Sequence, residues 1–262
     1  MKAILYVGHG SRVEQGNEEL HTFIQKAKRS FVDIPIQEVG FIELARPSIQ
    51  EAIQTCIEKG ADKIAVVPVL LLTAQHAKED IPEEIEKAKT LYPHVHFAYG
   101  RPFGVEQTIV SLVKQRAEQA GLKKVEGRPH YDEREPATLV LVGRGSSDAE
   151  QTSDLFKIAR LVWEYTPVHD IEVCYIAATR PNVEEGLEKA LRLKADNIYV
   201  IPYLLFTGVL MQGLQKQLQE LNEQTDKTFI LGDYLGFDDQ LLKVLVTRTE
   251  EVLTELEGIE HV

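Results

Sequence analysis

Three residues in the first half of the chain have side chains that could do chemistry together: His9, Glu43 and His76. Near neutral pH an imidazole can bind a borderline divalent metal or accept a proton, and a carboxylate can do either beside it. Two histidines with one carboxylate suit Fe²⁺, Co²⁺, Ni²⁺ or Zn²⁺. Gly8 and Gly10 flank His9, and their lack of side chains allows a sharp turn and the close approach of a broad flat ligand. These three residues are therefore candidate metal ligands and catalytic groups.

The chain repeats itself, and the candidate residues are missing from the second copy. Segment 5–11 returns as 140–146, and segment 67–73 returns as 201–207, with glycines, prolines and apolar runs kept. At the three candidate positions the second copy has other residues, which are Arg144, Ala177 and Leu210. A repeat that keeps its turn and core residues but loses these groups indicates a site that only the first copy has.

Short apolar runs rich in Val, Ile and Leu alternate with longer segments of helical period. This pattern is typical of buried parallel strands joined by helices. We expect an α/β fold of two similar domains, each a parallel four-stranded sheet flanked by helices. The expected strands are 3–8, 36–41, 63–69 and 95–99, and 138–143, 171–176, 197–204 and 228–232. The expected helices of the second half are 150–165, 182–194, 209–224 and 238–256.

The repeat also predicts the domain boundaries. The first domain is expected at 1–120 and the second at 137–262, with a charged, exposed connector at 121–136 that contains glycines and prolines. Local signals predict some helix ends: Pro47 and Pro82 suit first helical turns, Asp80 with Glu83 suits a capping box, and Gly60 suits a helix end.

The order of these elements predicts where the candidate residues meet. His9 ends the first strand, Glu43 follows the second and His76 follows the third. Functional loops of open parallel sheets gather beyond the carboxyl ends of the strands, and neighbouring strands lie about 4.8 Å apart. The three side chains are therefore expected at one edge of one sheet.

Composition excludes several classes of partner. The formal charge of −12, without a Lys/Arg block, argues against binding to nucleic acid or to an anionic membrane. No apolar run approaches the roughly 20 residues that span a bilayer, so we expect a soluble, cytoplasmic protein. Cys56 and Cys174 do not occupy equivalent positions in the two copies, and we expect two free thiols.

Each candidate also has an ordinary interpretation. The Gly8–Ser11 turn could bind phosphate, with His9 as a phosphohistidine nucleophile, although that chemistry usually needs an arginine cluster and only Arg12 is near in sequence. His76 could be a surface histidine and Glu43 a solvated charge. A P-loop lysine pattern and a Rossmann fingerprint are both absent from the sequence, so nucleotide binding is disfavoured.

The motifs of both copies resemble a known family. Val7-Gly8-His9-Gly10-Ser11, Arg46-Pro47 and the segment 67–82 are similar to the class II chelatases that insert a metal into sirohydrochlorin, above all the long, duplicated sirohydrochlorin ferrochelatase and cobaltochelatase branch. The resemblance implies two α/β domains with the tetrapyrrole in a cleft between them, a reaction without ATP, and siroheme or a cobalt precursor of cobalamin as the product. It implies no cofactor beyond the divalent metal substrate.

The resemblance also assigns residues. It places the metal-binding and proton-accepting histidines at His9 and His76 and their acidic partner at Glu43, which makes these three both the catalytic and the metal-binding candidates. The implied contacts with the macrocycle are Arg46, Leu70, Leu71, Leu72, Thr73, Ala74 and Gln75. The three leucines could offer an apolar face to the ring or could just complete a buried strand. Candidate cations for the substrate carboxylates are Arg12, Arg46, Lys78 and Arg101.

The second copy is expected to form the other wall of the cleft and to make the protein a monomer. Arg144 could reach a substrate carboxylate or could be a tolerated change. Some long members of this family in the cobalt pathway carry a His-rich tail or an iron–sulfur cysteine motif, and this sequence has neither. On the resemblance we therefore expect Fe²⁺ and siroheme over Co²⁺, with Ni²⁺ also chemically possible. Other hypotheses are a cobaltochelatase, a carrier of metal or tetrapyrrole without turnover, and a phosphotransfer enzyme.

Overall fold

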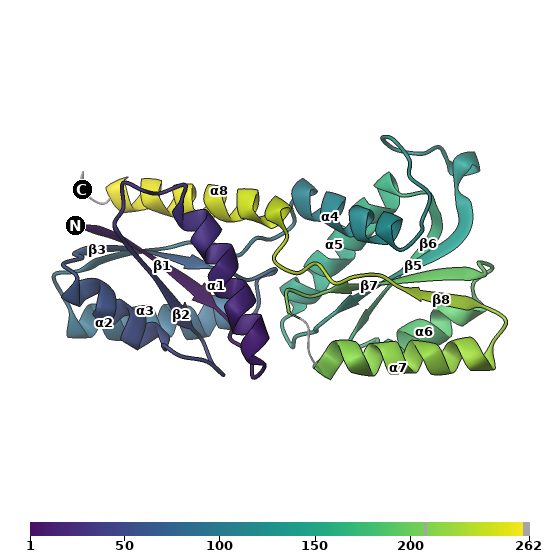
Figure 1. Cartoon of the computed structure of the whole chain (residues 1–262), viewed down its shortest axis with the longest axis horizontal. Coiled ribbons are helices and arrows are strands. Elements are labelled where there is room, and N and C mark those ends of the chain that lie inside the picture. The colour runs from purple at the N-terminus through teal and green to yellow at the C-terminus, as the bar shows by residue number, and fades with distance from the viewer. Residues whose placement is uncertain (207–208, 259–262) are drawn as a thin grey trace. The chain divides into compact units, whose positions relative to one another are not determined.

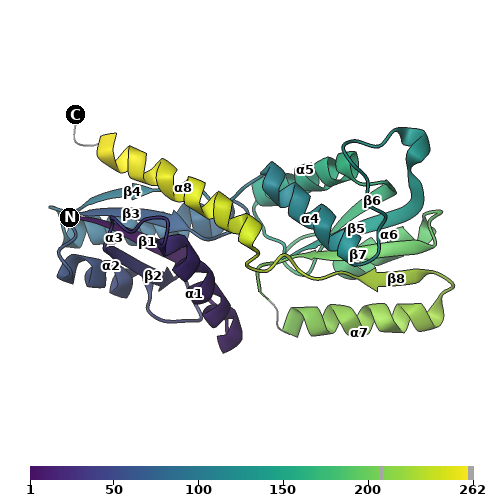
Figure 2. The same cartoon turned by 45° about the horizontal axis from the view of Figure 1, so that its top comes forward.

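The computed structural model describes residues 1–206 and 209–258, and only the backbone of residues 209 and 210. The chain forms two compact units, of which one contains residues 1–104 and the chain from Phe237 onward, and the other contains residues 105–236. Each unit has one parallel four-stranded sheet with helices on its faces (Figures 1 and 2). This confirms the predicted fold class, with two similar α/β domains.

In the first unit the strands are β1 (Lys2–Gly8), β2 (Ile36–Phe41), β3 (Lys63–Pro68) and β4 (His96–Tyr99), in the spatial order β2-β1-β3-β4. Val7 in β1 lies opposite Gly40 in β2 and Pro68 in β3. The central strand is buried along residues 3–8 because helices cover both faces of the sheet. The carboxyl ends of β1, β2 and β3 therefore meet at one edge.

Four helices cover this sheet. Helices α2 (Ile49–Glu58) and α3 (Ile81–Leu91) lie on one face, and α1 (Glu14–Lys28) and α8 (Asp239–Gly258) lie on the other (Figure 1). The core between the sheet and α2 and α3 is made of buried aliphatic side chains such as Leu5, Ile53 and Ile85.

The second unit repeats this plan. Its strands are β5 (Glu135–Gly143), β6 (Val168–Tyr175), β7 (Asn197–Tyr203) and β8 (Thr228–Leu231), in the order β6-β5-β7-β8. Helices α4 (Gln107–Gln119) and α5 (Ala149–Tyr165) cover one face, and α6 (Val183–Arg192) and α7 (Val209–Gln224) cover the other (Figure 2).

Two strands of the second unit begin earlier than predicted. β5 and β6 start at Glu135 and Val168, because these residues pair with each other beyond an irregularity in the ladder. Pro136, expected in the connector, therefore lies within β5, and residues 131–133 of the expected connector form a short 3₁₀ helix. The first part of β6 contains polar residues, so it does not form an apolar run that would predict a buried strand.

The last helix of each sequence repeat packs on the sheet of the other repeat. α4 ends the first repeat but packs on β7, whereas α8 ends the second repeat and packs on β3 and β4. The boundaries of the compact units therefore differ from the repeat boundaries at 120 and 137. Glycines allow the close approach: a Cβ at Gly100 would lie 2.4 Å from Val252 of α8, and one at Gly232 would lie 3.4 Å from the carbonyl oxygen of Arg116 in α4.

An arginine on each of these two helices anchors it. Arg248 of α8 is 2% exposed and donates hydrogen bonds to the carbonyl oxygens of Pro102 and Phe103, at 3.1 and 2.6 Å. Arg116 of α4 likewise donates hydrogen bonds to the carbonyl oxygens of Tyr234 and Leu235, both at 2.9 Å. The two anchors are equivalent in the two repeats.

Some predicted helix ends need correction. Pro47 precedes α2, and the capping box there is formed by Ser48 with Glu51. Asp80 makes no side-chain cap, because its carboxylate accepts a hydrogen bond from His76 instead. Pro82 does lie in the first turn of α3, and Gly60 follows the end of α2 with a φ of +94°, as predicted.

Two other expectations concern the whole chain. Cys56 and Cys174 are buried free cysteines, as predicted, and burial raises the pKa of each thiol to about 12. Within residues 1–206 and 209–258, no helix has both the length and the apolar character needed to cross a membrane.

Candidate metal and catalytic site

His9 lies at the carboxyl end of β1 in a turn that requires glycine. Gly10 has a φ of +93°, and a Cβ there would lie 1.9 Å from the carbonyl oxygen of Glu43. His9 Nδ1 is 3.1 Å from the Gly10 carbonyl oxygen. A carbonyl only accepts hydrogen bonds, so Nδ1 carries the proton and Nε2 can act as the ligand or base.

Glu43 follows β2 and is held against the same turn. Its backbone N–H donates to the His9 carbonyl oxygen at 3.1 Å, and the N–H of Ile42 donates to that of Gly8 at 2.9 Å. Leu44, the next residue, adopts a φ of +63°. These contacts place Glu43 Oε1 3.3 Å from His9 Nε2. The side chain of His9 is 11% exposed and that of Glu43 is 46% exposed, so the Glu43 carboxylate contacts both the His9 imidazole and solvent.

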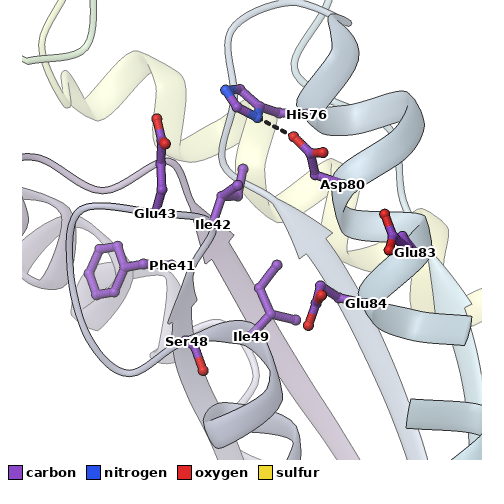
Figure 3. Close-up of a pocket in the computed structure, with 9 residues that line it drawn as sticks. All are labelled: Phe41, Ile42, Glu43, Ser48, Ile49, His76, Asp80, Glu83 and Glu84. Carbon is purple, nitrogen blue, oxygen red and sulfur yellow. Dashed lines mark hydrogen bonds and ion pairs between the residues drawn. The ribbon is translucent and has the colours of Figure 1, made fainter. Parts of the chain in front are cut away.

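His76 reaches the same edge from a π-helical turn, His76–Asp80, that leads directly into α3. Its Nδ1 donates to Asp80 Oδ2 at 2.5 Å (Figure 3). The Tyr99 hydroxyl donates to the Ala77 carbonyl oxygen at 2.8 Å and thereby ties the turn to the end of β4. The second ring nitrogen, Nε2, lies on the side of the ring away from Asp80.

The structure brings the three predicted residues together. One ligand atom from each of His9, Glu43 and His76 can be chosen so that all lie within 4.8 Å of one another, and the two imidazoles meet edge to face. Metal–nitrogen bonds are about 2.0–2.1 Å, so small side-chain movements would allow all three to bind one ion. Two nitrogens and one oxygen are a suitable ligand set for Fe²⁺ or Co²⁺.

A pocket of about 380 Å³ opens beside this cluster (Figure 3). Glu43, His76 and Asp80 line one part of it, and Glu83 and Glu84 of α3 line another. Carboxylates on several sides attract cations and repel anions. Its apolar lining residues, from β2, the following loop and the start of α2, are Phe41, Ile42 and Ile49.

The predicted contacts with the macrocycle lie in several environments. Arg46 is exposed, and its hydrogen bond to Glu51 lowers the pKa of Glu51 to about 2. The equivalent pair, Arg180 and Glu185, occurs in the second unit. Because the repeat without the histidines keeps this pair, it serves the fold whether or not Arg46 also binds a ligand.

The segment Leu70–Gln75 follows β3 directly. Leu72 is 6% exposed and belongs to the core, so a leucine face for a ring would come from the half-buried Leu70 and Leu71. The carbonyl oxygens of these two residues accept hydrogen bonds from the backbone of Phe103 and Gly104. The rest of the segment becomes progressively more exposed: Thr73 and Ala74 are half-buried and Gln75 is exposed.

The other candidate cations are on the surface. Arg12 and Lys78 are exposed side chains. Arg101 donates two hydrogen bonds to Glu251, at 3.1 and 2.9 Å. Its guanidinium is thus engaged with α8, which weakens the case for Arg101 as a substrate ligand.

The second unit keeps the scaffold of the site without its chemistry. Gly145 has a φ of +90°, and the Ala177 N–H donates to the Arg144 carbonyl oxygen at 2.9 Å, as the Glu43 N–H donates to His9. Arg144 and Ala177 are exposed, and the side chain of Leu210 lies outside the described residues. The same turn geometry therefore carries no metal ligands at these two positions.

Comparison with known proteins identifies the family. The CbiX family model matches residues 3–120 and again residues 138–252, the two halves of the internal repeat. The chain belongs to the CbiX family.

Long members of the CbiX family match nearly the whole chain. A sirohydrochlorin ferrochelatase from Priestia megaterium is 43% identical over 97% of this chain and 91% of the relative. A sirohydrochlorin cobaltochelatase from the same organism is 39% identical over 97% of this chain and 80% of the relative. The structure of SirB from Bacillus subtilis with Fe³⁺ has a TM-score of 0.85 and 37% identity, covering 98% of this chain and 97% of that one.

Sequence reasoning missed the contact of Asp80 with His76 at the candidate site. Asp80 was expected to cap α3 but contacts His76. Its spacing of four residues from the histidine was the available signal, because side chains at i and i+4 lie on one face of a helix.

Proposed function

We propose that this chain is a sirohydrochlorin ferrochelatase, which inserts Fe²⁺ into sirohydrochlorin without ATP to form siroheme. The observation that carries the proposal is the convergence of His9, Glu43 and His76 in the repeat that keeps them. The relatives named above support the substrate, since two of them are sirohydrochlorin chelatases that match the chain almost end to end.

The geometry suits the chemistry of insertion. The reaction exchanges two pyrrole N–H protons for one metal ion, so the site must hold the ion loosely and accept protons. We assign the metal-holding role to His76 together with His9, and the role of first proton acceptor to His9. Glu43 Oε1, 3.3 Å from His9 Nε2 and half exposed, would assist the metal and pass protons to solvent.

The macrocycle contacts stay part of the proposal. We propose Arg46 and the segment Leu70–Gln75 as binding residues, with Leu70 and Leu71 as the apolar surface for the ring. The expectations of a cytoplasmic, monomeric protein and of no further cofactor remain predictions.

A cobaltochelatase is the second candidate, because a relative with that name is 39% identical over nearly the full chain. The ligand set accepts either ion, and the Irving–Williams order favours Co²⁺ over Fe²⁺ in affinity. We favour iron because the Priestia megaterium ferrochelatase is 43% identical to this chain, compared with 39% for the cobaltochelatase of the same organism. A phosphotransfer enzyme is disfavoured, because the Glu43 carboxylate beside His9 would repel a phosphate.

One anaerobic assay tests the proposal. Purified protein is mixed with excess sirohydrochlorin and metal-buffered Fe²⁺ or Co²⁺, and the absorption change of the macrocycle gives the initial rate. Multiple turnovers above the uncatalysed rate, faster with Fe²⁺, are expected. A rate no higher than that of metal and pigment alone would refute a chelatase, a single stoichiometric turnover would indicate a carrier, and faster insertion of Co²⁺ would favour the cobaltochelatase.

A further inference from the structure

The hydrogen bond between His76 and Asp80 differs from the one that holds His9. Both histidines have Nδ1 engaged, but His9 donates to a neutral carbonyl of Gly10 at 3.1 Å and His76 donates to a carboxylate at 2.5 Å. Hydrogen bonds to an ionised acceptor are shorter and stronger than those to a neutral one. The Asp80 carboxylate is therefore the stronger of these two Nδ1 acceptors.

The segment from the end of β3 to the start of α3, which carries His76 and Asp80, contains one residue more than the equivalent segment of the second repeat. In α3 the buried residues Ile81, Ile85 and Ala88 have the same spacing as the buried or partly buried residues of α7, which are Leu214, Leu218 and Leu221. Pro68 and Pro202 are also equivalent, since they pair with Val7 and Val142.

The number of residues from the end of the strand to the first buried position of the helix then differs by one between the repeats. Ile81 follows Pro68 by 13 residues (81 minus 68), and Leu214 follows Pro202 by 12 (214 minus 202). The extra residue lies between Pro68 and Ile81, a stretch that includes the π-helical turn His76–Asp80, whereas the described part of α7 is α-helical from Val209. Single π turns within α-helices arise from one additional residue and are frequent at functional sites.

Asp80 is also lost together with His76. Depending on where the extra residue is placed, its counterpart is Gly213 or Leu214, neither of which has a carboxylate. The pair of Arg46 and Glu51 gives the opposite result, since the second repeat keeps it. A contact that serves only the fold is expected in both repeats, and a contact that serves the site only in the first.

We propose that Asp80 is a positioning residue for His76, an inference that rests on the proposed function. Its carboxylate accepts the Nδ1 proton, fixes the ring, and directs the Nε2 electron pair toward the metal ion shared with His9 and Glu43. The carboxylate also strengthens Nε2 as a donor, as acidic partners of metal-binding histidines do. Asp80 thereby holds His76 in place as a ligand of the ion, while His9 beside Glu43 keeps the role of first proton acceptor.

The test is a titration of the whole protein with Co²⁺, without tetrapyrrole and without oxygen, followed by the visible absorption of the bound ion. Asp80→Ala is expected to weaken Co²⁺ binding by about 10–100-fold, the usual effect of removing such a partner. Asp80→Asn keeps an acceptor oxygen without the charge, so its Kd is expected between those of Asp80→Ala and the wild type. Glu86→Gln is the matched control, since this exposed carboxylate of α3 pairs with Lys89.

Turnover adds a second readout. With sirohydrochlorin present, Asp80→Asn is expected to raise KM for the metal more than it lowers kcat, with Tm close to that of the wild type. If wild-type protein binds Co²⁺ and both Asp80 variants match its Kd and spectrum, the inference is wrong. The inference is also wrong if the two Asp80 variants lose Co²⁺ affinity only in proportion to a fall in Tm. A wild-type protein that binds no Co²⁺ would instead overturn the proposed function itself.

Discussion

His9 and His76 lie edge to face, with ring centroids 4.8 Å apart and ring planes at 83°. His9 directly follows β1, and His76 lies in the π-helical turn between the neighbouring strand β3 and helix α3. Each ring has its Nδ1 engaged by a separate acceptor. Each therefore offers Nε2 to the same small region beside Glu43. Pre-orientation of both rings reduces the conformational entropy that is lost when an ion binds.

Loss of either imidazole is expected to remove most activity. His9→Ala and His76→Ala should each lower kcat/KM by at least about 100-fold, because a positioned base alone contributes a factor of this size. Anaerobic insertion rates measure the effect, and circular dichroism verifies the fold. Arg144→Ala, at the position equivalent to His9, should stay near wild type; a loss as large as that of His9→Ala would contradict a second repeat without catalysis.

The glycine turns of the two repeats provide a matched pair. A Cβ added at Gly10 would lie 1.9 Å from the carbonyl oxygen of Glu43, and one added at Gly145 would lie 1.8 Å from the carbonyl oxygen of Ala177. Both glycines have a positive φ. Gly10→Ala and Gly145→Ala should each destabilise the fold, by about 1–2 kcal/mol from φ alone. Urea unfolding measures this cost. Only Gly10→Ala should also weaken Co²⁺ binding, so equal losses of affinity in two folded variants would disprove the assignment of the site.

Helices α8 and α4, each packed on the sheet of the other repeat, should depend on the buried Arg248 and the half-buried Arg116. Arg248→Met and Arg116→Met keep an apolar stem but leave two carbonyl oxygens without a charged donor, so each should cost on the order of 3 kcal/mol. Denaturant unfolding measures the loss, and Lys243→Met, an exposed change on α8, is the control. Stabilities equal to that of Lys243→Met would mean that packing alone holds these helices.

Stability should fall in acid partly through Glu251. Hydrogen bonds from Arg101, together with the nearby charge of Arg248, hold the pKa of Glu251 below its usual value. The unfolded chain then binds the proton more readily, so this contribution is complete above the unfolded pKa and is lost as pH falls through the folded pKa. Glu251→Gln should therefore be less stable than wild type at pH 7, and the gap should narrow below about pH 4.5, the region of the unfolded pKa.

The effect should be modest, because the Glu251 side chain is 40% exposed and exposed ion pairs contribute little. Chemical unfolding at several pH values, at low and high salt, measures it. If the difference in unfolding free energy between wild type and Glu251→Gln does not change with pH, the ionisation of Glu251 does not contribute to stability.

Much of this protein could be predicted from its sequence because the relevant signals are local or repeated. Apolar runs mark buried strands, and all eight strands of the described residues were predicted, with β2 correct at both ends. The meeting of His9, Glu43 and His76 was also predictable, since parallel neighbouring strands bring their carboxyl ends to one edge. The loss of all three in the second repeat indicated which half carries the site.

Only the tertiary structure decided which sheet each terminal helix covers and what Asp80 contacts. The sheets of the two repeats are alike, so the periodicity of α4 and α8 suits either one, and the choice depends on packing and on distant carbonyl groups that receive Arg116 and Arg248. Asp80 next to the start of α3 suits a helix cap equally well in sequence. In the structure the π-helical turn His76–Asp80 runs directly into α3, so Asp80 has helical dihedral angles that do not suit an N-cap, and its carboxylate contacts His76 instead.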